Sequence, residues 1–266
     1  QHAADRGDAQ AQFKLGECYY DGDGVEEDVQ QAVSWYNNAA AQGHMMAQYR
    51  LGYLYNEAEE VDANPKLAYK WLSRSAGQGL AEAQTELAIG HLYGDFGTVD
   101  LSLAEQWLQK AVKQNYPEAQ YFLARLYDDL AEEYGLEDRF VADDEDVFNL
   151  YLAAAQQDYS PAQKELAQCY LEGFGTDQNL EQAVEWYSES AQEGLDDAQW
   201  DYAVLLAGLD DEVNFPYDPE AALTWFRAAA EQGDDEYQLG FAEYLYQGEG
   251  IPQNISEAIF WCRQAV

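Results

Sequence analysis

A helical pattern of apolar positions recurs along the chain. A small residue is followed four positions later by Leu and eight positions later, in most cases, by Tyr, as in Ala11, Leu15 and Tyr19. Residues at this spacing share one face of an α-helix. A second segment then places Ala three residues before Trp, as in Ala32 and Trp35. The pattern predicts pairs of amphipathic helices.

The pairs repeat with a fixed register. Tryptophan stands at the same place in six units, at Trp35, Trp71, Trp107, Trp186, Trp225 and Trp261. In the remaining unit this place is taken by Leu150. Every first helix has a starting position that is followed directly by Gln: Ala11, Ala47, Ala83, Ala119, Ala162, Ala198 and Tyr237. Seven units of about 36 residues therefore fill the chain. We expect one domain over residues 1–266, with residues 1–10 as the tail of a preceding helix or a cap.

The helix ends have their own sequence signals. Seven residues before each Trp position stands an Asp or Asn that can accept hydrogen bonds from the free amides of a helix start: Asp28, Asn64, Asp100, Asp143, Asn179, Asp218 and Asn254. Eight residues after most Trp positions stands a residue that tolerates the left-handed conformation: Gly43, Gly79, Asn115, Asp158, Gly194 and Gly233. A helix pair this short cannot bury its own apolar face, so consecutive pairs must stack. The fold class predicted is all-α, a right-handed superhelical α-solenoid.

The chain resembles the Sel-one-like repeat (SLR) family, which is related to the tetratricopeptide repeats. The resemblance rests on motifs such as Ala11–Gly16, Asp21–Val25, Ala32–Tyr36 and Ala39–Gly43, and it extends over all seven units. It implies an adaptor that binds other proteins. Many bacterial members lie in signalling, secretion or envelope pathways, and some act as immunity proteins beside type VI secretion phospholipases. The resemblance leaves the compartment open between periplasm and cytoplasm.

Charge narrows the class of partner. The chain has 13 Lys and Arg against 51 Asp and Glu, a formal net charge of −38. Binding to phosphate backbones or anionic membrane surfaces needs basic residues, so we expect neither nucleic acid nor membrane as a partner. Since 47% of the residues are hydrophobic, the chain is not a disordered acidic tail. A basic protein or peptide is the partner that this charge favours.

No motif predicts catalysis. We expect no catalytic residue, no metal site and no cofactor, because nucleophile motifs, phosphate-binding loops and metal-ligand helices are absent. The three cysteines, Cys18, Cys169 and Cys262, are expected to be buried apolar residues. His91 takes a place that Tyr fills in other units, and we expect it to be buried with both ring nitrogens hydrogen-bonded.

Two surfaces are candidates for binding the partner. By analogy with tetratricopeptide repeats, one position of each first helix and the position four later face a concave groove. Their aromatic members are Phe13, Tyr49, Tyr53, Tyr121 and Trp200. The alternative is that these rings pack against the next unit.

The other candidate surface comes from the lengthened connections of the fourth and sixth units, which we expect to be acidic loops. Their candidate residues are Glu132, Glu133, Asp143, Asp144, Glu145, Asp210, Asp211 and Glu212. Insertions in repeat proteins often lie on the binding face, although drift in a solvated loop is the alternative.

These features favour a non-catalytic scaffold that binds a basic protein. One version is an immunity protein that inhibits a secreted toxin such as a phospholipase effector. The alternative is an envelope or signalling adaptor with several partners. A DNA mimic or an enzyme is less favoured.

Overall fold

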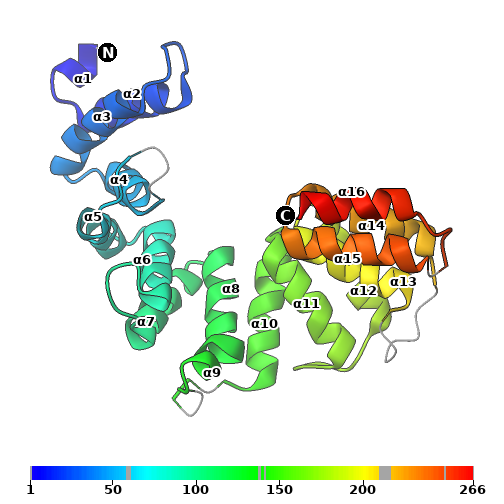
Figure 1. The fold of residues 1–266 in the computed structure, drawn as a ribbon. Helices are drawn as coiled ribbons and strands as arrows, with labels where there is room; N and C mark the ends of the chain where they lie inside the picture. The colour runs from blue at the N-terminus through cyan, green and yellow to red at the C-terminus, as the bar shows by residue number, and fades with distance from the viewer. Residues whose placement is uncertain are drawn as a thin grey trace. The chain divides into compact units, whose positions relative to one another are not determined.

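A computed structural model of the chain describes residues 2–57, 61–136, 139–140, 142–209, 217–248 and 250–265. All regular elements within these ranges are helices, which confirms the all-α class. The chain divides into two compact units, Gln1–Phe140 and Val141–Val266, and each is described by itself. Figure 1 shows the helices of each unit following one another in chain order.

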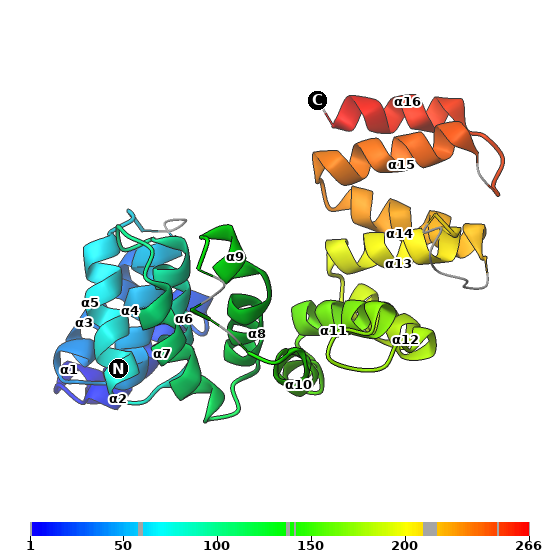
Figure 2. The same cartoon turned by 90° about the horizontal axis from the view of Figure 1, so that it is seen from below.

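The first unit holds three complete helix pairs and the first helix of a fourth. Its helices are α1 (His2–Asp5), α2 (Ala9–Asp21), α3 (Val29–Ala41), α4 (Met45–Glu57), α5 (Pro65–Gly77), α6 (Ala81–Tyr93), α7 (Leu101–Val112), α8 (Pro117–Arg125), η1 (Leu126–Leu130) and α9 (Ala131–Glu133). Each helix packs on the next in the chain, as Figure 2 shows for α4 to α7.

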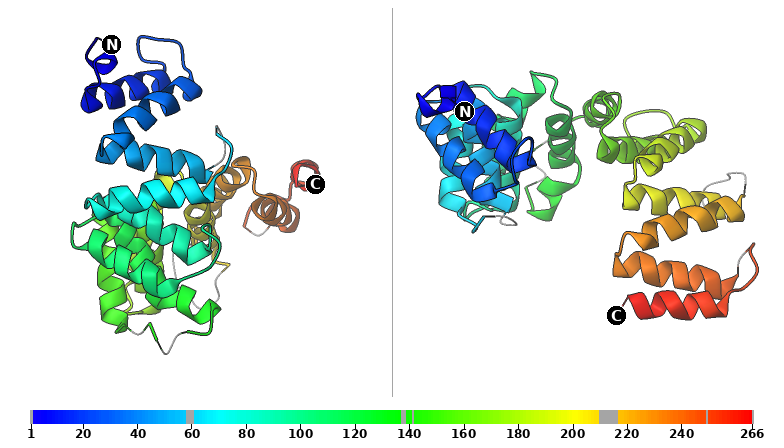
Figure 3. Two further views of the ribbon diagram at one scale, coloured as in Figure 1. Left: turned by 90° about the vertical axis from the view of Figure 1, so that its left-hand side faces the viewer. Right: turned by 90° about the horizontal axis from the view of Figure 1, so that it is seen from above.

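The second unit continues the same arrangement. Its helices are α10 (Asp144–Ala155), α11 (Ser160–Glu172), α12 (Leu180–Gln192), α13 (Asp196–Ala207), α14 (Pro219–Glu231), α15 (Asp235–Gln247) and α16 (Ile255–Gln264). Figure 3 shows α13 to α16 stacked in order, with the C-terminus on the outermost helix of this unit.

The predicted second-helix caps form in six of the seven units. The side chain of Asp28 accepts a hydrogen bond of 2.9 Å from the amide of Gln31, and equivalent bonds begin α5, α7, α12, α14 and α16. The prediction is wrong for Asp143, which precedes α10 but makes no side-chain capping bond. The left-handed turns also occur where expected, including the non-glycine residues Asn115 and Asp158, both with φ of 59°.

Close packing within each pair depends on small residues of the first helix. A Cβ added at Gly16 would lie 2.5 Å from the ring of Tyr36, and one at Gly52 would lie 2.5 Å from Leu72. Both large side chains are fully buried. The glycines therefore let the second helix approach to a distance that a methyl group would prevent.

The insertion of the fourth unit differs from the expected loop. Its first part continues α8 as a π-helical turn, Leu126–Leu130, followed by the short helix α9. Leu126, Leu130 and Ala131 are buried, and this apolar face keeps the segment helical. Glu132 and Glu133 therefore lie at the end of a helix rather than in a loop, which corrects the sequence-based prediction.

Candidate protein-binding surface

The first helices of consecutive pairs present a polar strip in the first unit. On this strip Arg50 of α4 reaches Glu17 of α2 with two hydrogen bonds, Nε to Oε1 at 3.1 Å and Nη2 to Oε2 at 3.0 Å. The hydroxyl of the fully buried Tyr36 also donates to Glu17. A bidentate interaction of this kind fixes both side chains and pairs the charge of Arg50 with that of Glu17.

Three carboxylates, those of Glu82, Glu86 and Glu118, lie near Tyr49 farther along this strip. Tyr49 lies beside Arg50, and its pKa is raised by burial and further by the nearby carboxylates of Glu86 and Glu118. Tyr116 donates a 3.3 Å hydrogen bond to Glu118, whose own pKa is raised by burial. Burial disfavours the charged form of a carboxylate, and a nearby positive charge favours it.

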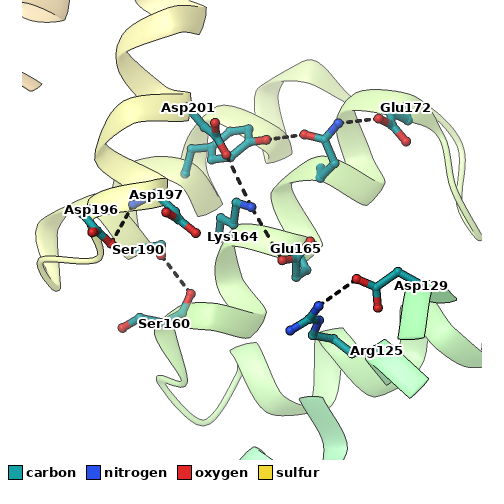
Figure 4. Close-up of polar contacts among 12 residues, drawn as sticks. Arg125, Asp129, Ser160, Lys164, Glu165, Glu172, Ser190, Asp196, Asp197 and Asp201 are labelled. Atoms are coloured by element: carbon teal, nitrogen blue, oxygen red, sulfur yellow. Dashed lines mark hydrogen bonds and ion pairs between the residues drawn. The ribbon is translucent and has the colours of Figure 1, made fainter. Parts of the chain in front are cut away.

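An equivalent strip occurs in the second unit, as Figure 4 shows. Lys164 of α11 lies 3.6 Å from Glu165 and 3.6 Å from Asp201 of α13. Burial raises the pKa of Asp201, and Asp197 raises it further, although Lys164 lowers it. The hydroxyl of Tyr237 on α15 donates to Asp197. Lys164 therefore lies beside a group of three carboxylates, which are Glu165, Asp197 and Asp201.

These strips share positions within the repeat. The reference residue of each repeat is the one that precedes the recurring Gln, such as Ala83 or Ala198. One residue before this position lie Glu82, Glu118 and Asp197, and three residues after it lie Glu86, Glu165 and Asp201. Positions at this spacing lie one turn apart on the same helix face. The aromatic pattern drew attention to two other positions of each first helix, those of Tyr49 and Tyr53, so sequence reasoning missed these carboxylates. Helical spacing of acids was the signal that could have found them.

The predicted aromatic residues are half-buried, and their surroundings differ. The ring of Phe13 stacks on His44 with centroids 4.7 Å apart, and Tyr49 lies 6.3 Å from Tyr53. Tyr121 packs edge-on against Phe122, with the guanidinium of Arg125 5.9 Å from its ring. Tyr49 lies on the strip of the first unit, whereas the ring of Phe13 on α2 contacts Tyr36 of α3 and His44 in the turn before α4.

Trp200 packs against the following repeat. Its ring stacks on Tyr237 with centroids 5.0 Å apart and contacts Phe226 edge-on at 4.7 Å. A Cβ added at Gly240 of α15 would lie 2.2 Å from the Trp200 ring. This arrangement is the one expected if the aromatic residue packs against the next repeat instead of binding a partner.

The acidic insertions are only partly described. Glu132 and Glu133 are exposed at the end of α9 in the first unit. Asp143, Asp144 and Glu145 are exposed at the start of α10 in the second unit. The remaining candidates, Asp210, Asp211 and Glu212, lie outside the described residues.

Two expectations about the remaining polar groups need correction. Cys169 is buried and Cys18 half-buried, but Cys262 is exposed because no described element packs over that side of α16. His91 is buried as expected, yet its Nε2 has no hydrogen-bond partner among the described residues. Within the same part of the chain, no group of three or more His, Cys, Asp or Glu side chains is placed to hold a metal ion. None of the described helices is long and apolar enough to cross a bilayer.

The comparisons with known proteins agree with the observed repeat. The profile of the Sel1 repeat matches seven segments, which are residues 9–44, 46–80, 81–116, 117–159, 160–195, 196–234 and 236–266. The chain is 31% identical to c5321, a protective antigen of uropathogenic Escherichia coli strains with an SLR fold (TM-score 0.73). That match covers 99% of this chain and 54% of the other, so the chain spans about half the length of this relative.

Two further solved structures have the same fold. A Sel1 repeat protein from Oxalobacter formigenes is 25% identical over 96% of both chains, with a TM-score of 0.79. An immunity protein from Pseudomonas aeruginosa is 19% identical over 84% of this chain and 81% of its own, with a TM-score of 0.51. The latter likeness concerns the fold alone. No curated protein matches the chain in sequence.

Proposed function

Since the chain belongs to the Sel1 repeat family, we propose that it is a non-catalytic scaffold that binds a basic protein through the acidic strips of its first helices. The observation that supports this most directly is the group around Lys164, which lies 3.6 Å from each of two carboxylates with Asp197 close by. Lys or Arg side chains of a partner would relieve the repulsion among these acids. The half-buried Tyr49 would add an aromatic contact to the strip of the first unit.

A more specific version is that the partner is a secreted toxin, such as a phospholipase effector, and that this chain is its immunity protein. The fold shared with an immunity protein of Pseudomonas aeruginosa supports it, at 19% identity. The alternative is an envelope or signalling adaptor. The two differ in what they bind, because an immunity protein has one tight partner and an adaptor has several modest ones.

The test begins by capturing partners of the full chain from a native lysate at low and high salt. We expect a basic protein to be retained at low salt and released at high salt, because exposed charge pairs are screened. The dissociation constant of the recovered protein is then measured for Asp197→Lys combined with Asp201→Lys. The strip predicts at least a tenfold loss of affinity.

Matched variants locate the contact. Asp177→Lys combined with Glu189→Lys changes the charge equally at two exposed positions and should alter affinity less than threefold. Reversal of Asp143, Asp144 and Glu145 tests the insertion separately. An acidic partner, or equal losses for the strip and control variants, would refute the proposal. One tight partner favours the immunity protein, and several weak ones favour the adaptor.

A further inference from the structure

Helix α5 has the opposite charge to the rest of the chain. Its sequence, Pro65–Gly77, contains Lys66, Lys70 and Arg74 and no Asp or Glu, in a protein with 51 acids. The three basic residues are spaced four apart, so they share one face of the helix, and all three are exposed. None of them forms an ion pair with a described residue.

The buried Trp71 helps to hold two of these side chains in place. Its ring centroid lies 4.2 Å from Nζ of Lys70 and 5.1 Å from Cζ of Arg74. Cation–π contacts of this kind orient the long side chains along the helix without neutralising their charge. The face therefore presents a preorganised row of positive charge. The row is about 12 Å long at 1.5 Å of rise per residue.

A cavity of about 320 Å³ adjoins the start of this row. It is lined by Pro65, Lys66, Tyr69, His91, Phe96 and Thr98. The rings of Tyr69, His91 and Phe96 pack edge-on with centroids 5.4 to 5.8 Å apart. A Cβ added at Gly90 would lie 2.2 Å from the ring of Phe96, so glycine is what allows Phe96 to lie against α6.

His91, one of the residues that line the cavity, has a ring nitrogen left unsatisfied by the described residues. His91 is only 7% exposed, and its Nε2 has no hydrogen-bond partner among the described residues. Leaving such an atom unpaired costs stability. Tyr69, by contrast, is 42% exposed, so an aromatic group can enter beside it.

From these observations we propose that Lys66, Lys70 and Arg74, with the cavity between Tyr69, His91 and Phe96, form a docking site for an acidic peptide segment of a partner protein that inserts one aromatic side chain. The row is longer than a single small anion can cover, whereas four residues of an extended chain match it. The rings of Tyr69, His91 and Phe96 line the cavity, so an aromatic side chain of the peptide can pack against them. A second copy of this chain fits poorly, since two molecules with charge −38 repel each other.

The probe is a fluorescein-labelled peptide with five Glu on each side of a central Tyr, titrated with the full chain in 150 mM NaCl. At this salt concentration the acids elsewhere are screened beyond about 8 Å. We expect binding that Lys66→Glu combined with Arg74→Glu weakens at least tenfold. Arg6→Glu combined with Lys14→Glu is the matched control, since it reverses two exposed cations elsewhere and should change affinity less than threefold.

The cavity is tested with a second peptide in which Ala replaces the central Tyr. For the unaltered protein, we expect the Ala peptide to bind at least fivefold more weakly than the Tyr peptide. For the Tyr69→Ala variant, we expect the two peptides to bind with equal affinity. This comparison does not depend on the charge variants being folded. Equal affinity of the two peptides for the unaltered protein would overturn the proposal.

Other outcomes assign the patch to a different ligand and also overturn the proposal. These are full displacement of the peptide by millimolar inorganic phosphate, preference for phosphatidylserine vesicles over the peptide, or self-association lost in the α5 variant. The proposal goes beyond the scaffold function and is separable from it. Substitutions on α5 should leave the basic partner's affinity unchanged.

Discussion

Gln78 donates a 2.8 Å hydrogen bond from Nε2 to Oε1 of Gln48, thirty residues earlier in the chain. Gln48 in turn donates from its own Nε2 to the carbonyl oxygen of Ala40 at 3.1 Å. The same two-step connection joins Gln42 to Gln12 and Gln114 to Gln84. The connection ties each of these buried glutamines to the last turn of the preceding second helix and to the end of the second helix of its own repeat. Within the described residues both steps form at Gln12, Gln48, Gln84 and Gln199, which accounts for the Gln at these positions.

The fifth repeat breaks this connection. Glu193 stands where Gln42, Gln78 and Gln114 stand in other repeats, and a carboxylate cannot donate a hydrogen bond. Oε1 of the buried Gln163 accordingly has no partner among the described residues. We expect Glu193→Gln to supply the missing donor and to raise the free energy of unfolding by about 1 kcal/mol. Urea denaturation measures this change.

Glu189→Gln is the matched control for this substitution. It removes the same charge one turn earlier on α12, at an exposed position where no hydrogen bond is gained. It should alter the free energy of unfolding by less than about 0.5 kcal/mol. Equal gains for the two variants would show that charge, rather than the hydrogen bond, is responsible.

Two glycines of the first unit should respond oppositely to the same change. Gly52→Ala places a methyl group 2.5 Å from Leu72 Cγ and 3.0 Å from its backbone nitrogen, so we expect a loss of about 1–3 kcal/mol in unfolding free energy. Gly77 is exposed at the end of α5, with nothing within 4 Å of an added Cβ, and Gly77→Ala should gain about 0.5–1 kcal/mol. Thermal melts compare the pair. Destabilisation by both variants would contradict the role given to close packing.

The acidic strip of the second unit predicts a pH dependence. Burial raises the pKa of Asp201 in the folded state, so in the range just above pH 4 the folded protein holds more protons than the unfolded chain. Stability from this group is therefore lost as pH rises through that range. Asp201→Asn should make the free energy of unfolding fall less between pH 4 and pH 7, measured by urea titrations. Asp177→Asn, at an exposed loop position, is the matched control for the loss of one carboxylate.

The local features of the fold could be predicted from the sequence. Helix pairs, the capping role of Asp28 and the left-handed turn at Asn115 depend on residues within one unit, where spacing fixes the geometry. The π-helical turn at Leu126–Leu130 could not be predicted. The segment is helical rather than a loop because Leu126 and Leu130 are buried, and burial depends on neighbouring elements.

The candidate site was harder to predict than the fold. Lys164, Glu165 and Asp201 lie on two repeats, so their proximity depends on how α11 and α13 stack. No pattern within one unit gives that stacking. The buried histidine was found by its departure from the Tyr consensus, but its unpaired nitrogen depends on neighbouring segments around Tyr69 and Phe96.

The contacts of Trp200 predict that its main role is structural. Its ring lies over Gly240 and stacks on Tyr237, whereas Leu239, at the same position of the next repeat, is 49% exposed. We expect Trp200→Ala to lower the free energy of unfolding by about 3 kcal/mol. Leu239→Ala should lower it by less than about 1 kcal/mol, because little area is buried there.

The same pair then separates stability from binding. At a temperature where both variants are folded, Trp200→Ala should retain the affinity for a basic partner within about threefold, which is less than 1 kcal/mol. If Trp200→Ala costs no more stability than Leu239→Ala and yet abolishes binding, Trp200 is a contact residue of the concave surface. The junction between these two repeats would then owe its packing to Phe226 and Tyr244, whose rings lie 4.7 Å apart.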